Sequence, residues 1–208
     1  MRRPVFLSIF PGTNYSSPET NFFCWYHSSF WLPIVHLNFI RAQPAQLELY
    51  LDFLEEIAAW LHARGIAQWR PGDFRRATDY YRQAVAGGEV WLAYAETELV
   101  GTLRILPADP IVWPEVKVDD AVYVNTLAVR RDWAHAGVGP ALLAWADTVA
   151  YRMGRTYVRL DCMADNAFLR RYYAQAGFAA RGEIDADYPA SVGTLRLLRF
   201  ERPAIRNL

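Results

Sequence analysis

The amino-acid sequence predicts one mixed α/β domain, with a mostly antiparallel sheet and helices on both of its faces. The chain has 208 residues, of which 53% are hydrophobic and 21% charged, as expected for one globular core. Segments with apolar residues at three- and four-residue steps alternate with short apolar runs, which indicates helices between strands. The runs "VWLAYA" and "LVGTLRIL" flank the turn "ETE", which predicts a β-hairpin and hence antiparallel pairing.

The predicted elements follow one another from residue 35 to the C-terminal part of the chain. The predicted helices cover residues 47–61, 78–86, 140–153 and 166–176. The predicted strands cover residues 35–41, 90–95, 99–106, 122–129, 156–163, 178–184 and 194–201. Proline and glycine, as in Pro71-Gly72, predict loops between these elements.

Residues 1–36 differ in composition from the rest, and we expect them to be a dispensable extension of a domain that covers residues 37–208. The uncharged run from Phe22 to Ile40 approaches the length of a membrane span. Its histidines and serines, together with Pro33 and Asn38, favour an extension over a membrane anchor.

Charge and cysteine content exclude several classes of protein. The formal net charge is zero, which argues against a nucleic-acid surface and against a basic membrane-binding patch. Cys24 and Cys162 do not form a disulfide framework, so a reducing cytoplasm is the expected compartment. Cys24 and His27 have the spacing of metal ligands, but no second pair follows, and we predict no metal site.

The glycine turn Gly137-Val138-Gly139 lies between a predicted strand and a predicted helix. Glycines allow close approach to the backbone, and the N–H groups at a helix start favour a phosphate. Pro140 suits the first helical position but removes one donor. A dinucleotide fold is a rival interpretation, with Asp161 as the ribose-binding acid, although Leu142 replaces the third glycine. A plain tight turn is the other alternative.

The segment "DNAFLRRYYAQAGF" adds a second motif. Asn166 and Tyr173 are two helical turns apart and share one helix face, and Gly177 ends the helix. The strand, glycine turn, helix, strand and "N…YY…GF" order resembles the GNAT superfamily of acyl-CoA-dependent N-acetyltransferases over about residues 37–203. This resemblance implies a twisted sheet with the glycine turn between the fourth strand and the third helix. It also implies that the strand before the turn splays away from the next strand.

The resemblance also implies a role for each part of the site. The end of the strand before the turn would hydrogen-bond the acetyl carbonyl and the pantetheine arm through Leu127, Ala128 and Val129. The turn and helix start would hold the coenzyme A pyrophosphate through Ala134, His135, Ala136, Gly137, Val138, Gly139, Pro140 and Ala141. Asn166 would contact the pantetheine arm. Tyr173 would be the general acid for the thiolate, with Tyr172 as the alternative.

The chain departs from the family pattern at the start of the turn. The family usually has Arg or Gln three residues before the first glycine, where this chain has Ala134. A side-chain contact to phosphate is therefore missing. Arg130 or Arg131 could replace it, or both could be a solvated pair after a strand.

The second departure concerns the general base. Related sequences often carry Glu or His on the strand that faces the amine, where this chain has Asn125, which cannot abstract a proton. A chain of water molecules, Asp120 or Asp161 stays open as the base.

The resemblance implies transfer of an acetyl group from acetyl-CoA to a primary amine of a small molecule or peptide. A non-catalytic acyl-CoA-binding or protein-interaction module on the same fold is the alternative. Trp69, Trp113 and Tyr123 either line the acceptor pocket or belong to the core. No nucleic-acid partner is expected, and a homodimer is left open.

Overall fold

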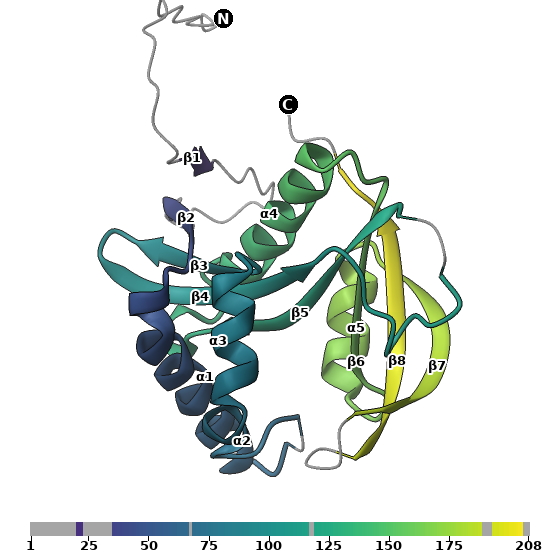
Figure 1. Cartoon of the computed structure of the whole chain (residues 1–208), viewed down its shortest axis with the longest axis horizontal. Coiled ribbons are helices and arrows are strands. Elements are labelled where there is room, and N and C mark those ends of the chain that lie inside the picture. The colour runs from purple at the N-terminus through teal and green to yellow at the C-terminus, as the bar shows by residue number, and fades with distance from the viewer. Residues whose placement is uncertain (1–19, 23–34, 67, 117–118, 189–192, 206–208) are drawn as a thin grey trace, which may run out of the picture.

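The computed structural model describes residues 20–22, 35–66, 68–116, 119–188 and 193–205, which form one sheet with helices on both faces (Figure 1). The strand order in the sheet is β1-β2-β3-β4-β5-β6-β8-β7. The strands are β1 (Thr20–Phe22), β2 (Leu37–Arg41), β3 (Val90–Ala95), β4 (Glu98–Leu106), β5 (Ala121–Val129), β6 (Tyr157–Met163), β7 (Ala179–Asp187) and β8 (Thr194–Pro203). The helices are α1 (Leu47–His62), α2 (Asp73–Arg76), α3 (Thr78–Ala86), α4 (Val138–Arg152) and α5 (Ala167–Gln175).

Alternation along the strands divides the core between the two faces of the sheet. In β3, Val90 and Leu92 pack with α1 and α3, whereas Trp91 and Ala93 pack with α4. Successive side chains of a strand point to opposite faces, so both faces of this central strand are buried. Helices α1 to α3 therefore cover one face, and α4 and α5 cover the other.

The predicted elements are confirmed, with two additions and several shifted boundaries; β7, for example, extends to Asp187, where the sequence predicted an end at residue 184. The short strand β1 and the short helix α2 were not expected, so the glycine turn lies between β5 and α4 in the numbering of the structure. Helix α4 begins at Val138, whereas the sequence predicted a start at Pro140. The prediction that Pro140 is the first helical residue was wrong: it is the third, still within the turn whose N–H groups need no intrahelical acceptor.

Strands β5 and β6 form the one parallel pair among the described strands, and they pair over a short distance only. Their register runs from Ala121 opposite Tyr157 to Val124 opposite Leu160. Beyond that point the two strands no longer pair with each other, although β5 stays paired with β4 and β6 with β8, and Figure 1 shows them diverging. We call this opening the β5–β6 fork. It confirms the predicted splay.

A bulge in β5 marks the start of the fork. Thr126 has φ 48°, which is unusual for a β-branched residue, and the β4–β5 register shifts between Thr102 and Arg104. The extra residue bends β5 away from the line of β6. Backbone strain of this kind is concentrated at functional sites.

Helix α4 lies unusually close to β4 at Gly101. A Cβ atom added to Gly101 would lie 2.9 Å from Cγ1 of Val138 and 3.1 Å from Cδ1 of Leu142. Glycine at this position therefore lets the first turn of α4 press against the sheet. The N-terminus of α4 is held close to the end of β5 as a result.

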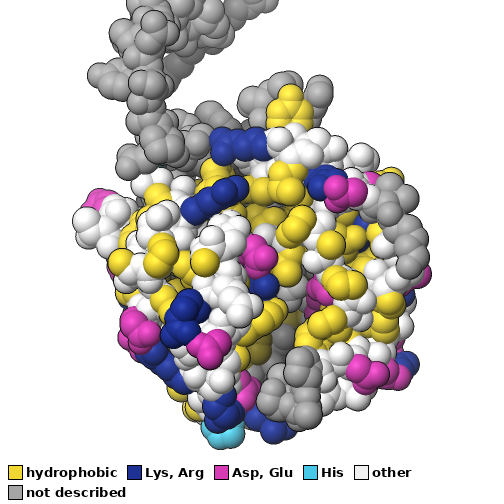
Figure 2. Space-filling view, in the orientation of Figure 1, with side chains coloured by type: hydrophobic (Ala, Val, Ile, Leu, Met, Phe, Trp, Pro, Cys, Tyr) yellow, Lys and Arg dark blue, Asp and Glu magenta, His cyan; other side chains and the backbone are white. Residues whose placement is uncertain are grey.

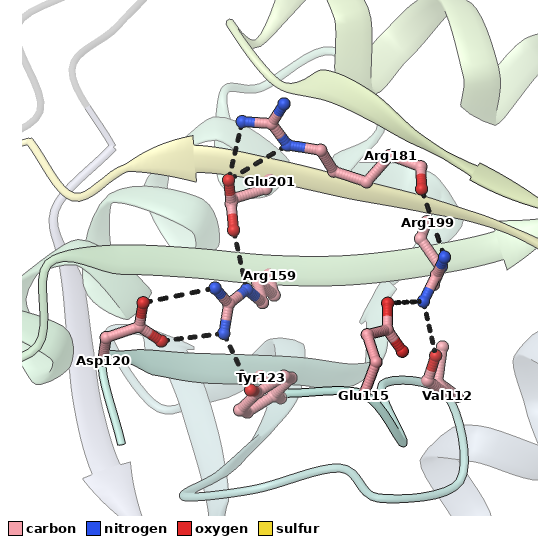
Figure 3. A network of polar contacts seen from close by, with 8 residues as sticks. All are labelled: Val112, Glu115, Asp120, Tyr123, Arg159, Arg181, Arg199 and Glu201. Atoms are coloured by element: carbon pink, nitrogen blue, oxygen red, sulfur yellow. Dashed lines mark hydrogen bonds and ion pairs between the residues drawn. The ribbon is translucent and has the colours of Figure 1, made fainter. Parts of the chain in front are cut away.

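A buried cation holds the closed end of the fork (Figure 3). Arg159 of β6 donates hydrogen bonds to Glu201 of β8 at 2.7 Å, to Asp120 at 2.9 Å and to the Tyr123 hydroxyl of β5 at 2.9 Å. Only 7% of its side chain is exposed. A guanidinium with so little solvent depends on these partners, so the three chain segments are held together. We call these four residues the Arg159 cluster.

We expect Arg159→Ala to lower the free energy of unfolding by about 3–5 kcal/mol, because it removes the cation that pairs with Asp120 and leaves Glu201 with Arg181 alone. Urea denaturation followed by circular dichroism measures this change. Arg196→Ala is the matched control, since Arg196 on β8 is 57% exposed in its ion pairs and should cost less than about 1 kcal/mol. Equal losses in the two variants would contradict a special role for the cluster.

Candidate active site

The turn before α4 has the backbone shape of an anion-binding site. His135 and Gly137 both have positive φ, at 70° and 82°, on either side of Ala136. Positive φ at alternate residues turns neighbouring N–H groups toward one concave surface. The positive φ of His135 was not predicted from the sequence, because only glycine commonly indicates a residue with positive φ.

Four amides of this turn have no acceptor. Among the described residues, none accepts a hydrogen bond from the backbone N–H of His135, Gly137, Val138 or Gly139. The last two belong to the first turn of α4, where the helix dipole adds a partial positive charge. Pro140 contributes no donor. The arrangement therefore offers several N–H groups to a phosphate without help from a side chain.

The two arginines beside the turn are occupied elsewhere. Arg130 forms ion pairs with Glu98 of β4 at 3.3 Å and with Glu56 of α1 at 3.5 Å. The Arg131 guanidinium lies 3.8 Å from the ring centroid of Trp60, also on α1. Both side chains thus lie on the α1 side of the sheet, and neither occupies the position that Ala134 leaves without a cation.

The end of β5 turns backbone groups toward the fork. The Arg130 amide donates to the Val100 carbonyl of β4 at 2.9 Å. Because backbone groups alternate in direction along a strand, the amide of Ala128 also faces β4, and those of Leu127 and Val129 face the opposite edge. That edge faces the part of β6 that no longer pairs with β5. The amides of Leu127 and Val129 are therefore available to a ligand in the fork.

Asn166 is the N-cap of α5 and has two partners within the chain. Its Oδ1 accepts a hydrogen bond from the Leu169 amide at 3.0 Å, and its Nδ2 donates to Oε1 of Gln68 at 3.3 Å. The Gln68 contact joins α5 to the loop between α1 and α2. Sequence reasoning missed Gln68, because nothing in its local sequence indicates a partner so far along the chain.

Tyr173 is buried between α5 and the sheet. Only 6% of it is exposed, and its ring packs against Phe178 and Phe200 at centroid distances of 6.0 and 5.6 Å. Burial, together with the neighbouring Cys162, Tyr172 and Asp161, raises the pKa of the Tyr173 hydroxyl above its ordinary value. The phenol therefore stays protonated at neutral pH and can act as a proton donor.

Tyr172 points elsewhere, toward the glycine turn. A Cβ atom added to Gly139 would lie 2.6 Å from the Tyr172 hydroxyl oxygen, so this side chain reaches across from α5 to the first turn of α4. Its ring stacks on Phe168, and burial raises its pKa to about 12. The two neighbouring tyrosines thus have separate surroundings. Tyr173 is the one that lies near Asp161 and Cys162, in the part of β6 that no longer pairs with β5.

Several other candidate residues belong to the structural core. Asp120 is a partner of Arg159. Trp113 and Tyr123 are buried against each other, with ring centroids 6.2 Å apart, and the Arg159 guanidinium lies 5.2 Å from the Trp113 ring centroid. Trp69, by contrast, is only partly buried: it packs edge-on against Phe74 of α2 and lines a pocket together with Ile66 and Pro71. Figure 2 shows a hollow between α3 and the β6–β8 side of this face, with hydrophobic side chains along it.

The structure adds two limits. Within the described ranges, no group of three or more metal-ligating side chains occurs and no helix is long and apolar enough to cross a membrane. Cys24 and His27 lie outside the described residues. The sheet does not have the parallel series of a dinucleotide fold, since β5–β6 is the one parallel pair described.

Comparison with known proteins assigns the family. Residues 54–178 match the family model described as the acetyltransferase (GNAT) family. The chain is 30% identical over 147 residues to YesJ of Bacillus subtilis (strain 168), an uncharacterized N-acetyltransferase, which covers 68% of this chain and 81% of that protein. The chain therefore belongs to the GNAT acetyltransferase family and is an acetyltransferase.

Solved structures agree on the fold. A GNAT-family acetyltransferase from Listeria monocytogenes 4b F2365 superimposes with a TM-score of 0.68 at 21% identity, covering 84% of this chain and 98% of its own. The yncA protein of Salmonella typhimurium, solved with its cofactor acetyl-CoA, gives a TM-score of 0.56 at 16% identity and covers 83% and 96%. At these identities the likeness establishes the mixed α/β GNAT fold.

We expect Gly139→Ala to destabilise the protein by about 1–3 kcal/mol, because its methyl group collides with the Tyr172 hydroxyl. Tyr172→Phe removes that oxygen and leaves the ring carbon Cζ at 3.5 Å, an ordinary contact distance. In the Tyr172→Phe background the same alanine should cost nothing, since alanine favours a helix over glycine. A double-mutant cycle of unfolding free energies measures the coupling, and purely additive effects would contradict the contact.

Proposed function

We propose that this acetyltransferase binds acetyl-CoA between α4 and α5 and transfers its acetyl group to a primary amine of a small molecule or peptide. One observation carries the proposal: the unpaired amides of the glycine turn lie beside the β5–β6 fork, into which Tyr173 also packs. The groups that bind the phosphates, hold the acyl group and donate the proton would then lie next to one another.

Each part of the site has a role in this reaction. The turn from Ala134 to Ala141 would hold the pyrophosphate through its backbone. The end of β5, from Leu127 to Val129, would bind the pantetheine arm, and the Leu127 amide would stabilise the oxyanion. Asn166 would contact the pantetheine arm and Tyr173 would protonate the leaving sulfur. Holding amine and thioester together would supply much of the acceleration.

The placement of the arginines bears on affinity. With Arg130 and Arg131 held by α1, and with alanine at position 134, the pyrophosphate would rest on backbone amides and the helix dipole alone. The family assignment supports a transferase over a non-catalytic acyl-CoA-binding module. Acetyl-CoA binding without turnover of any amine would favour that alternative.

The test is calorimetric titration with acetyl-CoA and, in parallel, NADH, followed by Tyr173→Phe kinetics on an amine panel of alkylamines, aromatic amines, polyamines and short peptides. We expect acetyl-CoA alone to bind. Tyr173→Phe should bind it equally but lower kcat by about 100-fold or more, because only the proton donor is lost. Tyr151→Phe, an exposed tyrosine on α4, is the control. Unchanged kcat in Tyr173→Phe at every pH would contradict the assigned acid.

We also propose that residues 37–208 form the transferase domain and that residues 1–36 are dispensable. Within the extension, β1 pairs with the outer edge of β2, from Thr20 opposite Phe39 to Phe22 opposite Leu37. Because this edge is remote in strand order from the fork, removing residues 1–36 should leave acetyl-CoA affinity unchanged. Titration of the truncated chain measures this, and a weakened affinity would contradict dispensability.

A further inference from the structure

The reaction needs a group that removes a proton from the amine, and the fork has one carboxylate in the right place. Asp161 is the first residue of β6 beyond the last β5–β6 pair, Val124 opposite Leu160. Leu160 packs on the α4 side, so Asp161 points to the opposite face of the sheet. It therefore lies at the base of the fork, across the sheet from Tyr173.

The carboxylate of Asp161 is not used for structure. None of the described residues donates a hydrogen bond to it or forms an ion pair with it, and it is only partly buried. Two cations are close to Asp161 in the sheet, and both have other partners. Arg159 of the same strand is bound to Asp120 and Glu201, and Arg199, opposite Asp161 on β8, is paired with Glu115. The two aspartates therefore differ: Asp120 is bound to Arg159, whereas the Asp161 carboxylate is free to accept a proton.

A second carboxylate is held beside it from another element. Asp109, in the loop after β4, accepts hydrogen bonds from Nδ2 of Asn125 at 3.2 Å and from the Val112 amide at 3.1 Å. Asn125 follows Val124, just as Asp161 follows Leu160, so the two side chains share one face at the base of the fork. Asn125 thus fixes Asp109 near Asp161.

These neighbours change the proton affinity of Asp161. Burial, and then the charge of Asp109, raise the pKa of Asp161 to about 7. The other titratable groups that interact with Asp161 are Tyr188 after β7, Tyr173 on α5 and Cys162 on β6, whose pKa values burial and Asp161 raise. A carboxylate with a pKa near the working pH is suited to general base catalysis.

We propose that Asp161 is the general base that deprotonates the acceptor amine, and that Asn125 and Asp109 are its positioning residues. The inference rests on the proposed function, because it places the amine in the fork on the α1–α3 side and the thioester on the α4–α5 side. It also gives a role to Asn125, which cannot itself abstract a proton.

The proton balance of the step is complete. Asp161 accepts one proton from the ammonium group and releases it to solvent. The amine lone pair forms the C–N bond, the C–S bond breaks with its electron pair on sulfur, and Tyr173 donates its proton to that sulfur. The surplus proton on nitrogen then restores the Tyr173 hydroxyl. The products are the amide, the free thiol and one proton in solution.

The experiment follows thiol release from acetyl-CoA across a pH series, first with water as the acceptor and then with the amine panel. The base must be ionised to act, so the wild-type rate should rise with pH around a value of about 7. Asp161→Asn should lower the rate about 100-fold or more and abolish this rise, and Asp161→Glu should restore part of both. Asp185→Asn, an exposed acid on β7, is the matched control.

Asp109→Asn supplies a readout that a structural role would not change. Removing its charge should move the rise to lower pH, because that charge raises the pKa of Asp161. Calorimetry with acetyl-CoA accompanies every variant. If Asp161→Asn binds acetyl-CoA yet keeps the wild-type rate and pH profile, the base assignment is wrong. If the wild-type chain fails to bind acetyl-CoA, the proposed function fails instead.

Discussion

The Arg159 cluster is the constraint on which the site depends. A guanidinium buried among strands needs compensation, and its carboxylate partners come from β8 and from the segment before β5. The cation therefore fixes the spacing of β5, β6 and β8 at the closed end of the fork. One residue further along β6, at Leu160, the pairing with β5 ends. A sheet clamped at one end and bulged at Thr126 can open at the other without losing its core.

The polar groups around the fork lie on two different faces of the sheet. Helices α4 and α5 supply the unpaired amides of the turn, the cap of α5 and the protonated phenol of Tyr173. The opposite face carries the apolar side chains that pack under α1 to α3 and, beside the fork, the carboxylates of Asp109 and Asp161. In the proposed reaction, the acyl donor and the amine would approach from different sides of the sheet and meet between β5 and β6.

The sequence predicted most of the fold because hydrophobic periodicity and glycine positions are local signals. Helix α1, the β3–β4 hairpin and the turn before α4 follow from them directly. The start of α4 was misplaced because proline is most common at the first helical position, whereas Pro140 occupies the third. The contact between Gln68 and Asn166, the positive φ of Thr126 and the partners of Arg130 depend on tertiary packing. No local pattern encodes them.

The close contact at Gly101 has an evolutionary consequence. The side chains at positions 101, 138 and 142 share the space between β4 and α4. The fold therefore limits their total volume and not the size of any one of them. In related chains a larger side chain at one of these positions should be accompanied by a smaller one at another. Substitutions at positions 101 and 142 would shift the start of α4, and with it the amides of the turn that have no acceptor.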